Sequence, residues 1–362
     1  MRITILALAA VTVALGAGVR GESVVEFSPR AATAPATEPN PAEVKAIEAL
    51  QPSGAQIVRE GGRPDGAVIE VVIQSVGASD ALLEQVVTFK HLRVLRLSSG
   101  TKVTDAGVAR LAELQELQEV GLSFSQMTDA GLGQLKELTG LRTLDLGKTR
   151  VTDAGLAQLK AFPQLKSLAL TGTAVTDEGM VQVGELRQLE TLWLAMIHVT
   201  DEGVAHLRKL DQLKVLDLRG TQVSDAGLLN LRGLMKLQFL ALSGTEVTGS
   251  GLGHLQKLPE LQTLICGGRK VTDEAAVGLQ EFKGLQSLDM SYANLTDEGV
   301  GPLAGIKTLQ SLTLQGTKVT DAGLEKLRGL TGLQTLVVSD TKVTAKGVAA
   351  LQEALPACKI RR

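Results

Sequence analysis

The sequence predicts an α/β solenoid: a curved horseshoe with a parallel β-sheet on its concave side and helices on its convex side. Two observations lead to this prediction. The same pattern restarts every 24 residues from Leu117 to Leu333. Within each copy, inward residues first alternate with outward ones and then recur every third position, which indicates a strand followed by a helix. A constant period of this length is the signature of stacked repeats.

Eleven clear repeats cover residues 92–356, and a degenerate first repeat covers residues 68–91. Terminal units of a solenoid would otherwise leave its apolar core open. We therefore expect residues 43–91, which include the degenerate repeat, to form an N-terminal cap. Residues 357–362 depart from the period and predict a C-terminal cap strand.

The first residues predict export. Arg2 precedes an apolar run that ends in small residues, which is typical of a secretory signal peptide over residues 1–21 and too short for a comfortable membrane span. An uncleaved N-terminal anchor is the alternative. Residues 22–42 are rich in Ala and Pro and predict a disordered spacer. We expect a secreted, periplasmic or cell-envelope protein that is not inserted in a membrane after cleavage.

One repeat, residues 141–164, shows how the unit is built. Leu144 and Leu146 alternate with outward residues and predict a strand with one buried face. Leu156 and Leu159 predict the buried side of a helix. Paired strands lie about 4.8 Å apart, whereas packed helices need about 8–10 Å, so stacking must curve the solenoid.

The repeat reads LxxLxLxxTxVTDxGLxxLxxL, which resembles the leucine-rich-repeat subclass found in F-box adaptor proteins and in many secreted bacterial proteins. The resemblance covers residues 68–362 and implies a leucine-rich-repeat solenoid. It does not imply a ligand, because binding faces diverge within one fold. No F-box segment precedes the repeats, so the resemblance does not extend to the adaptor role.

Two polar positions recur with the period, and we interpret both as structural. A threonine in the turn after each strand is expected to bridge backbone groups of adjacent turns. The aspartate of the TD pair is expected to favour the N-terminus of its own helix, rather than to form a calcium array. The turn residues are Thr101, Ser125, Thr149, Thr173, Thr221, Thr245, Thr317 and Thr341.

Composition and spacing argue against several functions. The net charge of −2 gives no electrostatic reason to expect nucleic acid. Cys266 and Cys358 are predicted to lie about 20 Å apart, too far for a disulfide, and to serve as small apolar residues. No metal or cofactor site and no catalytic set can be assembled, so we predict no cofactor and no enzyme activity. The enzymatic alternative is a catalytic site within residues 43–91 or one that is created together with a partner.

The candidate site lies on the concave face of repeats five to nine. Strand alternation predicts that Trp193, the only tryptophan, and Phe239 point outward, followed by Tyr292, the only tyrosine. Tryptophan and tyrosine are frequent binding hot spots. Packing of Trp193 on Phe239, or neutral drift, is the alternative explanation. The partner-binding residues we predict are Trp193, Met196, Phe239, Ile265 and Tyr292, with a polar rim of Asp217, Arg219 and Asp289.

We therefore predict a non-catalytic scaffold, monomeric in solution, that binds a protein or peptide. Exposed rings flanked by hydroxyl and carboxyl groups also suit a cell-envelope glycan, and a structural envelope protein is a further alternative.

Overall fold

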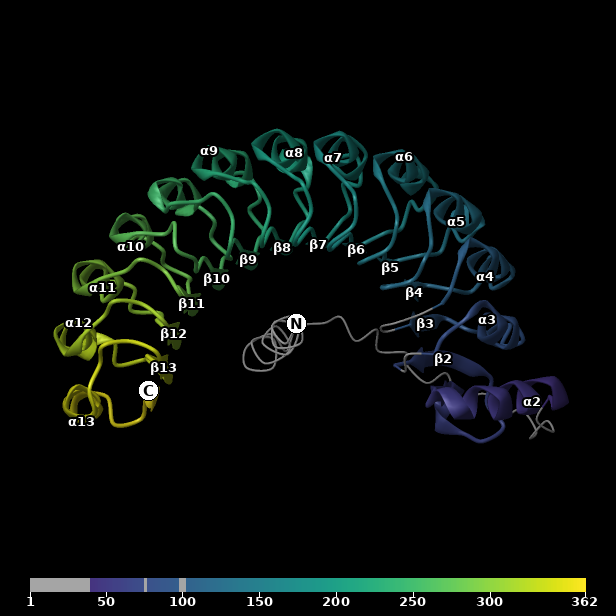
Figure 1. The fold of residues 1–362 in the computed structure, drawn as a ribbon, viewed down its shortest axis with the longest axis horizontal. Helices are drawn as coiled ribbons and strands as arrows, with labels where there is room; N and C mark the ends of the chain where they lie inside the picture. Colours follow the sequence, from purple (N-terminus) through teal and green to yellow (C-terminus); the bar gives the residue numbers. More distant parts are fainter. Residues whose placement is uncertain (1–39, 75–76, 98–101) are drawn as a thin grey trace. The chain divides into compact units, whose positions relative to one another are not determined.

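The computed structural model describes residues 40–74, 77–97 and 102–362. The predicted signal peptide, most of the predicted spacer and Thr101 lie outside these residues. Pro39–Arg362 form one compact unit, and within it the described strands line the inner side of an arc whose outer side is made of helices (Figure 1). The predicted solenoid with a concave parallel sheet is therefore confirmed.

A single sheet runs through the described part of the unit, with its strands in chain order. Most pairs are parallel and advance by one repeat, so that Leu144 lies opposite Leu168 and Leu168 opposite Leu192. The exception is the first pair, which is antiparallel. The strands are β1 (Gln56–Arg59), β2 (Val68–Ile73), β3 (Val94–Leu97), β4 (Glu119–Gly121), β5 (Thr143–Asp145), β6 (Ser167–Ala169), β7 (Thr191–Trp193), β8 (Val215–Asp217), β9 (Phe239–Ala241), β10 (Thr263–Ile265), β11 (Ser287–Asp289), β12 (Ser311–Thr313), β13 (Thr335–Val337) and β14 (Lys359–Arg361).

The convex side is built from short helices, because each repeat has room for about two turns before the chain returns to the sheet. The α-helices are α2 (Pro41–Leu50), α3 (Asp80–Val86), α4 (Asp105–Arg110), α5 (Asp129–Gln134), α6 (Asp153–Leu156), α7 (Asp177–Val183), α8 (Asp201–His206), α9 (Asp225–Leu228), α10 (Asp273–Leu279), α11 (Asp297–Leu303), α12 (Asp321–Lys326) and α13 (Ala345–Ala354). Several continue as 3₁₀ turns: η3 (Leu111–Glu113), η4 (Leu135–Glu137), η5 (Ala157–Ala161), η6 (Leu207–Lys209), η7 (Leu229–Leu231) and η9 (Leu327–Gly329). The cap holds η1 (Gln51–Ser53) and η2 (Glu60–Gly62), and η8 (Ser250–Leu255) replaces an α-helix in one repeat.

The core consists of the periodic aliphatic residues. Leu144, Leu146, Leu156 and Leu159 are buried, as the pattern predicts, and their equivalents form one continuous apolar cluster along the unit. Burying a leucine side chain contributes about 1.5–3 kcal/mol, so this stack supplies the main driving force for folding. Cys266 and Cys358 are buried members of the cluster and are not joined.

Separate elements cover the two ends of the core. At the N-terminal end, α2 packs with its buried Ala46 and Leu50 while β1 adds an antiparallel strand to β2. At the C-terminal end, β14 pairs with β13 and places Lys359 and Arg361 on the sheet edge. Charged side chains on an edge strand oppose pairing with another chain.

The turn after each strand differs in one detail from the expectation. Thr149 donates its hydroxyl hydrogen bond to the carbonyl of Leu146 in its own turn, at 2.7 Å, and Thr173 does the same to Leu170. The expectation that these hydroxyls bridge adjacent turns is therefore wrong. The hydroxyl reaches back three residues because the turn folds the chain over its own strand end.

The recurring aspartates join successive repeats. Asp129 accepts hydrogen bonds from the backbone N–H of Thr152, at 2.8 Å, and from its hydroxyl, at 2.6 Å. Thr152 belongs to the next repeat, so these hydrogen bonds join repeats, while Asp129 itself stands in the first turn of its own helix α5, as expected. We call this contact the Asp–Thr link. It joins Asp80–Thr104, Asp105–Thr128, Asp129–Thr152, Asp153–Thr176, Asp177–Thr200, Asp201–Ser224, Asp225–Thr248, Asp273–Thr296, Asp297–Thr320 and Asp321–Thr344.

The link also explains the glycine of the TDxG motif. A Cβ atom on Gly155 would lie 2.2 Å from Oδ1 of Asp129 in the preceding repeat, which is closer than any real contact. The same collision, at 2.2 Å, would occur between Gly107 and Asp80. Glycine is therefore required at this position because the linking carboxylate occupies the space of its side chain.

Departures from the motif follow the same rule. Leu82 stands at the glycine position in the repeat of α3. Among the described residues, no aspartate of an earlier repeat links to this one, so no carboxylate occupies the space of the side chain. Ala345 replaces the aspartate in the last repeat. In the interior, Gly249 replaces an aspartate and Ala275 replaces the glycine of the next repeat, and a Cβ on Gly249 would lie 2.4 Å from Cβ of Ala275. Where the carboxylate is lost, the space is taken by a methyl group.

We predict strong coupling between Asp129 and Gly155. Gly155→Ala alone is expected to destabilise the protein by about 2 kcal/mol, because the new methyl group collides with the carboxylate and breaks its hydrogen bonds. In an Asp129→Ala background the same change is expected to be neutral or to stabilise by up to about 1 kcal/mol, the usual gain of alanine over glycine in a helix. Urea unfolding of the four proteins measures the coupling, and additive effects would contradict this role of glycine.

We also predict an acid-sensitive contribution from the links. Hydrogen bonds from the N–H and hydroxyl of Thr344 lower the pKa of Asp321. For Asp225, burial raises the pKa, but hydrogen bonds from Thr248, Gly251 and Gly249 outweigh it and the net shift is downward. Each carboxylate thus binds its proton less readily when folded. The contribution is present above the usual pKa of about 3.9 and is lost as the pH falls through the lowered folded-state value.

Asp321→Asn should accordingly lower the free energy of unfolding at neutral pH, and its difference from wild type should shrink as the pH drops below about 3.9. Urea midpoints across a pH series test this. A difference that is the same at neutral and strongly acidic pH would argue that the charge of Asp321 has no part in the link.

Candidate functional site

Pairing of the strands places the predicted site residues in common positions. The third residues of β7, β8, β10 and β11 are Trp193, Asp217, Ile265 and Asp289, and the pairing aligns them along the concave face. Phe239 is the first residue of β9 and lies opposite Val215 of β8. The sheet thus brings these five predicted residues onto one surface, as strand alternation predicts.

Trp193 and Phe239 contact each other across β8. Their ring centroids are 6.1 Å apart and the ring planes are inclined by 51°, a usual geometry for an aromatic pair. Phe239 is only 6% exposed, whereas Trp193 remains half-buried. The expectation that both rings are exposed is therefore wrong for Phe239, because the large ring of Trp193 reaches over the intervening strand.

Asp217 lies on the strand between these two rings and is 1% exposed. It pairs with Arg219, in the turn after β8, through contacts of 2.9 Å and 3.1 Å to Nε and 2.6 Å to Nη2. The hydrogen bond to Asp217 raises the pKa of Arg219, against the opposing effect of burial. The expected polar rim thus differs here: the carboxylate is covered and neutralised, and the partly exposed guanidinium is the group that faces solvent.

Met196 and Tyr292 occupy equivalent positions in their repeats, three residues after the ends of β7 and β11. Both have positive φ, 58° for Met196 and 57° for Tyr292. Glycine occupies the equivalent position in other repeats, including Gly220 and Gly316. The side chain of Met196 leans over Gly220, and the ring of Tyr292 leans over Gly316, since a Cβ on those glycines would meet them at 3.3 Å and 2.4 Å. The side chains remain 48% and 55% exposed.

Sequence reasoning missed a third apolar residue in this position. Phe124 has φ of 61° and is 47% exposed. The signal was present in the sequence, since glycine fills this position in five other repeats and a bulky residue departs from it; these glycines are Gly172, Gly220, Gly244, Gly268 and Gly316. Lys148 and Asp340 are the other non-glycine residues at this position with positive φ.

The N-terminal half of the concave face carries charged groups that neutralise one another, also missed by sequence reasoning. Arg96 binds Glu119 and, at 2.8 Å, Glu70, and the hydrogen bond to Glu119 raises the pKa of Arg96. Further along, hydrogen bonds from Lys166, at 2.7 Å, and Lys214, at 2.8 Å, lower the pKa of Glu190. These exposed networks contribute little to stability, and the second of them lies at the starts of β6, β7 and β8, next to the strand that carries Trp193.

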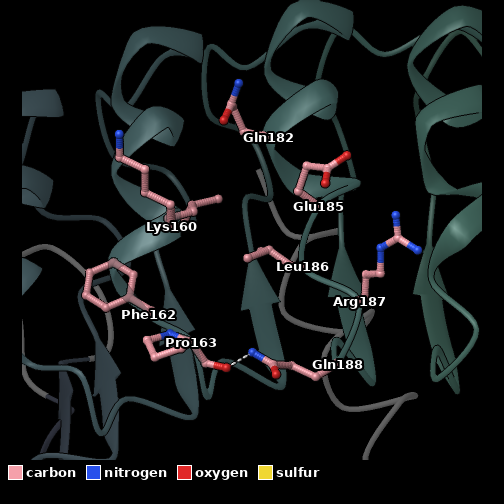
Figure 2. Close-up of a pocket in the computed structure, with 9 residues that line it drawn as sticks. Lys160, Phe162, Pro163, Gln182, Glu185, Leu186, Arg187 and Gln188 are labelled. Atoms are coloured by element: carbon pink, nitrogen blue, oxygen red, sulfur yellow. Dashed lines mark hydrogen bonds between the residues drawn. The ribbon is translucent and has the colours of Figure 1, made fainter.

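A shallow pocket of about 320 Å³ lies elsewhere, where η5 and α7 lead back toward the sheet (Figure 2). Gln188 donates a hydrogen bond to the carbonyl of Pro163 across it, so these two groups satisfy each other. The pocket holds none of the predicted site residues. Its lining comprises Leu159, Lys160, Phe162, Pro163, Gln182, Glu185, Leu186, Arg187 and Gln188.

Residues 40–74, 77–97 and 102–362 contain no group of three or more His, Cys, Asp or Glu side chains that could hold a metal ion. Burial, with a smaller effect from Asp289, raises the pKa of the Cys266 thiol, which is thereby held in its neutral form. Within the same residues no helix is long and apolar enough to span a bilayer.

Comparisons with known proteins agree with the geometry. The structure is similar to an internalin (inlF) of Listeria monocytogenes, with a TM-score of 0.59 and 20% identity over 91% of this chain and 98% of that chain. It is also similar to a chain of the mouse RP105/MD-1 complex, with a TM-score of 0.52 and 22% identity over 72% of this chain and 45% of that chain. At these identities the likeness is one of fold.

No curated protein sequence matches the chain. Residues 140–320, however, match the family described as a leucine-rich repeat region, which is half of the sequence. With the repeat, the parallel sheet and this match in agreement, the chain belongs to the leucine-rich-repeat family.

Proposed function

We propose that this protein is a non-catalytic binding scaffold that recognises a protein or peptide on the concave face between β7 and β11. One observation carries the proposal: in a chain with 2% aromatic residues, the only tryptophan lies on strand β7 of this face and the only tyrosine on the turn after β11, and they are partly and largely exposed, respectively. Apolar side chains on a surface are favourable to bury, and such rings commonly anchor partners.

The backbone supports this choice of residues. A non-glycine residue at positive φ costs about 1–2 kcal/mol relative to glycine. Met196 and Tyr292 bear this cost, and the exposed half of each side chain gains nothing from packing within the fold. Retaining strained, exposed apolar residues is consistent with selection for contact with a partner.

The predicted residues divide into two roles. Trp193, Met196, Ile265 and Tyr292 would contact the partner. Phe239 would support the ring of Trp193 from beneath, and Asp217 would hold the guanidinium of Arg219 on the rim.

The setting of the interaction is part of the proposal. The apolar run and small residues of 1–21 favour export to the periplasm, cell envelope or medium, with no membrane insertion after cleavage. We propose a monomer with no cofactor. The net charge of −2 gives no reason to invoke nucleic acid.

A neutral glycan is the second candidate. Strands β10 to β13 begin with the hydroxyl residues Thr263, Ser287, Ser311 and Thr335, aligned by the strand pairing. Each follows a glutamine, so this part of the sheet offers uncharged donors and acceptors at the strand spacing. Saturation-transfer NMR with soluble neutral polysaccharides distinguishes this candidate from a peptide ligand.

Affinity capture from envelope and secreted fractions of the native organism tests the leading proposal. The Trp193→Ala/Tyr292→Ala variant is expected to lose at least about tenfold in affinity for a retained protein, because truncating two hot-spot residues typically costs more than 1 kcal/mol each. The matched control is Met235→Ala/Val277→Ala, which truncates two exposed apolar residues outside the concave strands. Equal loss in both variants, or none in either, would contradict a concave site.

Stability and binding should also separate at the strained positions. Met196→Gly and Tyr292→Gly are each expected to leave the free energy of unfolding unchanged or to raise it by about 1 kcal/mol, since glycine adopts positive φ without strain. Both are expected to weaken partner binding. Urea unfolding followed by the fluorescence of Trp193 measures the first effect. A clear loss of stability in both variants would assign these side chains to the fold instead.

A further inference from the structure

Three aspartates occupy the same position on the concave face. Asp145, Asp217 and Asp289 are the third residues of β5, β8 and β11. In each, Oδ1 accepts a hydrogen bond from the backbone N–H two residues later, at 2.9 Å, 3.0 Å and 2.8 Å respectively. This shared contact fixes the three carboxylates in the same orientation, so the three repeats can be compared directly.

The second oxygen, Oδ2, has a different partner in each repeat. In Asp145 it accepts the hydroxyl hydrogen bond of Ser123 from the preceding repeat. In Asp217 it accepts hydrogen bonds from the guanidinium of Arg219. In Asp289 the hydroxyl of Ser291 goes to Oδ1, at 2.5 Å, and no donor or ion pair to Oδ2 is present within the described residues.

The local sequence explains why Asp289 is left open. Gly267 stands where Ser123 stands relative to Asp145, and it has no side chain to donate. Ser291 stands where Arg219 stands relative to Asp217, so the cation is also missing. The next residue is Tyr292, whose exposed side chain lies in the turn after β11, where the repeat of β8 has Gly220.

We propose that Asp289 and Tyr292 receive an arginine side chain of the protein partner. The inference rests on the proposed function and names the chemistry of one of its contacts. The repeat of β8 provides the template, because there the same carboxylate holds a guanidinium through Nε and Nη2. At β11 the partner supplies the guanidinium that the chain itself lacks.

Guanidinium suits the position better than ammonium for two reasons. Its planar fork presents parallel N–H donors to a carboxylate, and it stacks on aromatic rings. Tyr292 supplies such a ring, held in place over Gly316. Asp289 supplies the negative charge. Within the described residues, no lysine, arginine or histidine forms an ion pair with it.

The test uses N-acetyl-arginine amide as the probe and the ring signals of Tyr292 as the reporter. Because Tyr292 is the only tyrosine, selective labelling of tyrosine gives a single ring to follow by NMR. We expect saturable shifts in the millimolar range with the arginine probe and responses at least about fivefold weaker with N-acetyl-lysine amide. Asp289→Asn should weaken the arginine response about tenfold, as expected for loss of a charge-assisted hydrogen bond.

Two further variants keep the test decisive. Ser291→Arg is expected to place an internal guanidinium on Asp289, as Arg219 does on Asp217, and to abolish the response while the protein stays folded. Asp211→Asn, which removes an exposed carboxylate outside the concave strands, should leave the response unchanged. Equal titration of wild type, Asp289→Asn and Ser291→Arg would overturn the inference.

Capture of the partner separates this inference from the proposed function. If Trp193→Ala loses the partner while Asp289→Asn and Ser291→Arg retain it fully, the arginine contact is wrong and the concave scaffold stands. If all three retain it, the concave site itself fails. If Trp193→Ala, Asp289→Asn and Ser291→Arg all lose the partner, the result supports both the concave site and the arginine contact.

Discussion

The Asp–Thr link is the interaction on which the rest of the structure depends. Each repeat is too small to bury its own apolar side, so it must stack on its neighbours in one register. Asp129 accepts hydrogen bonds from both the backbone N–H and the hydroxyl of Thr152, the residue just before the helix of the next repeat. Repeated along the chain, this contact sets the register in which the repeats stack. It also satisfies an N–H that the start of a helix leaves without a partner.

Because the link and the buried leucines hold the frame, the concave side chains are free to vary. Asp145, Asp217 and Asp289 keep one backbone contact in common while their second oxygens face different surroundings. In the same way, the positive-φ position accepts glycine in some repeats and Met196 or Tyr292 in others. Function in such a fold is set by a few substitutions on a surface whose geometry is already given.

Periodicity and alternation were sufficient to predict the solenoid, the buried leucines and the concave placement of Trp193, Ile265 and Asp289, since all of these depend on spacing within one repeat. Contacts between repeats were not predictable in this way. The partner of Asp129 lies in the next repeat, and the burial of Phe239 depends on how far the ring of Trp193 reaches across β8. Phe124 was missed because its exposure follows from a positive φ in the turn. The sequence indicates that conformation only through the glycines at the equivalent position of other repeats.

The most direct test is to restore the link at the one interior repeat junction that lacks it within residues 102–362. Gly249→Asp/Ala275→Gly restores the motif, with Thr272 as the residue that would donate to the new carboxylate. Gly249 has a φ of 117°, so any side chain there strains the turn, and Gly249→Ala/Ala275→Gly is the control that carries the same strain without a carboxylate. We predict that the aspartate variant has a free energy of unfolding about 1–2 kcal/mol above that of the alanine control and leaves partner binding on the concave face unchanged. An aspartate variant no more stable than the control would contradict the claim that the Asp–Thr link holds the repeats together.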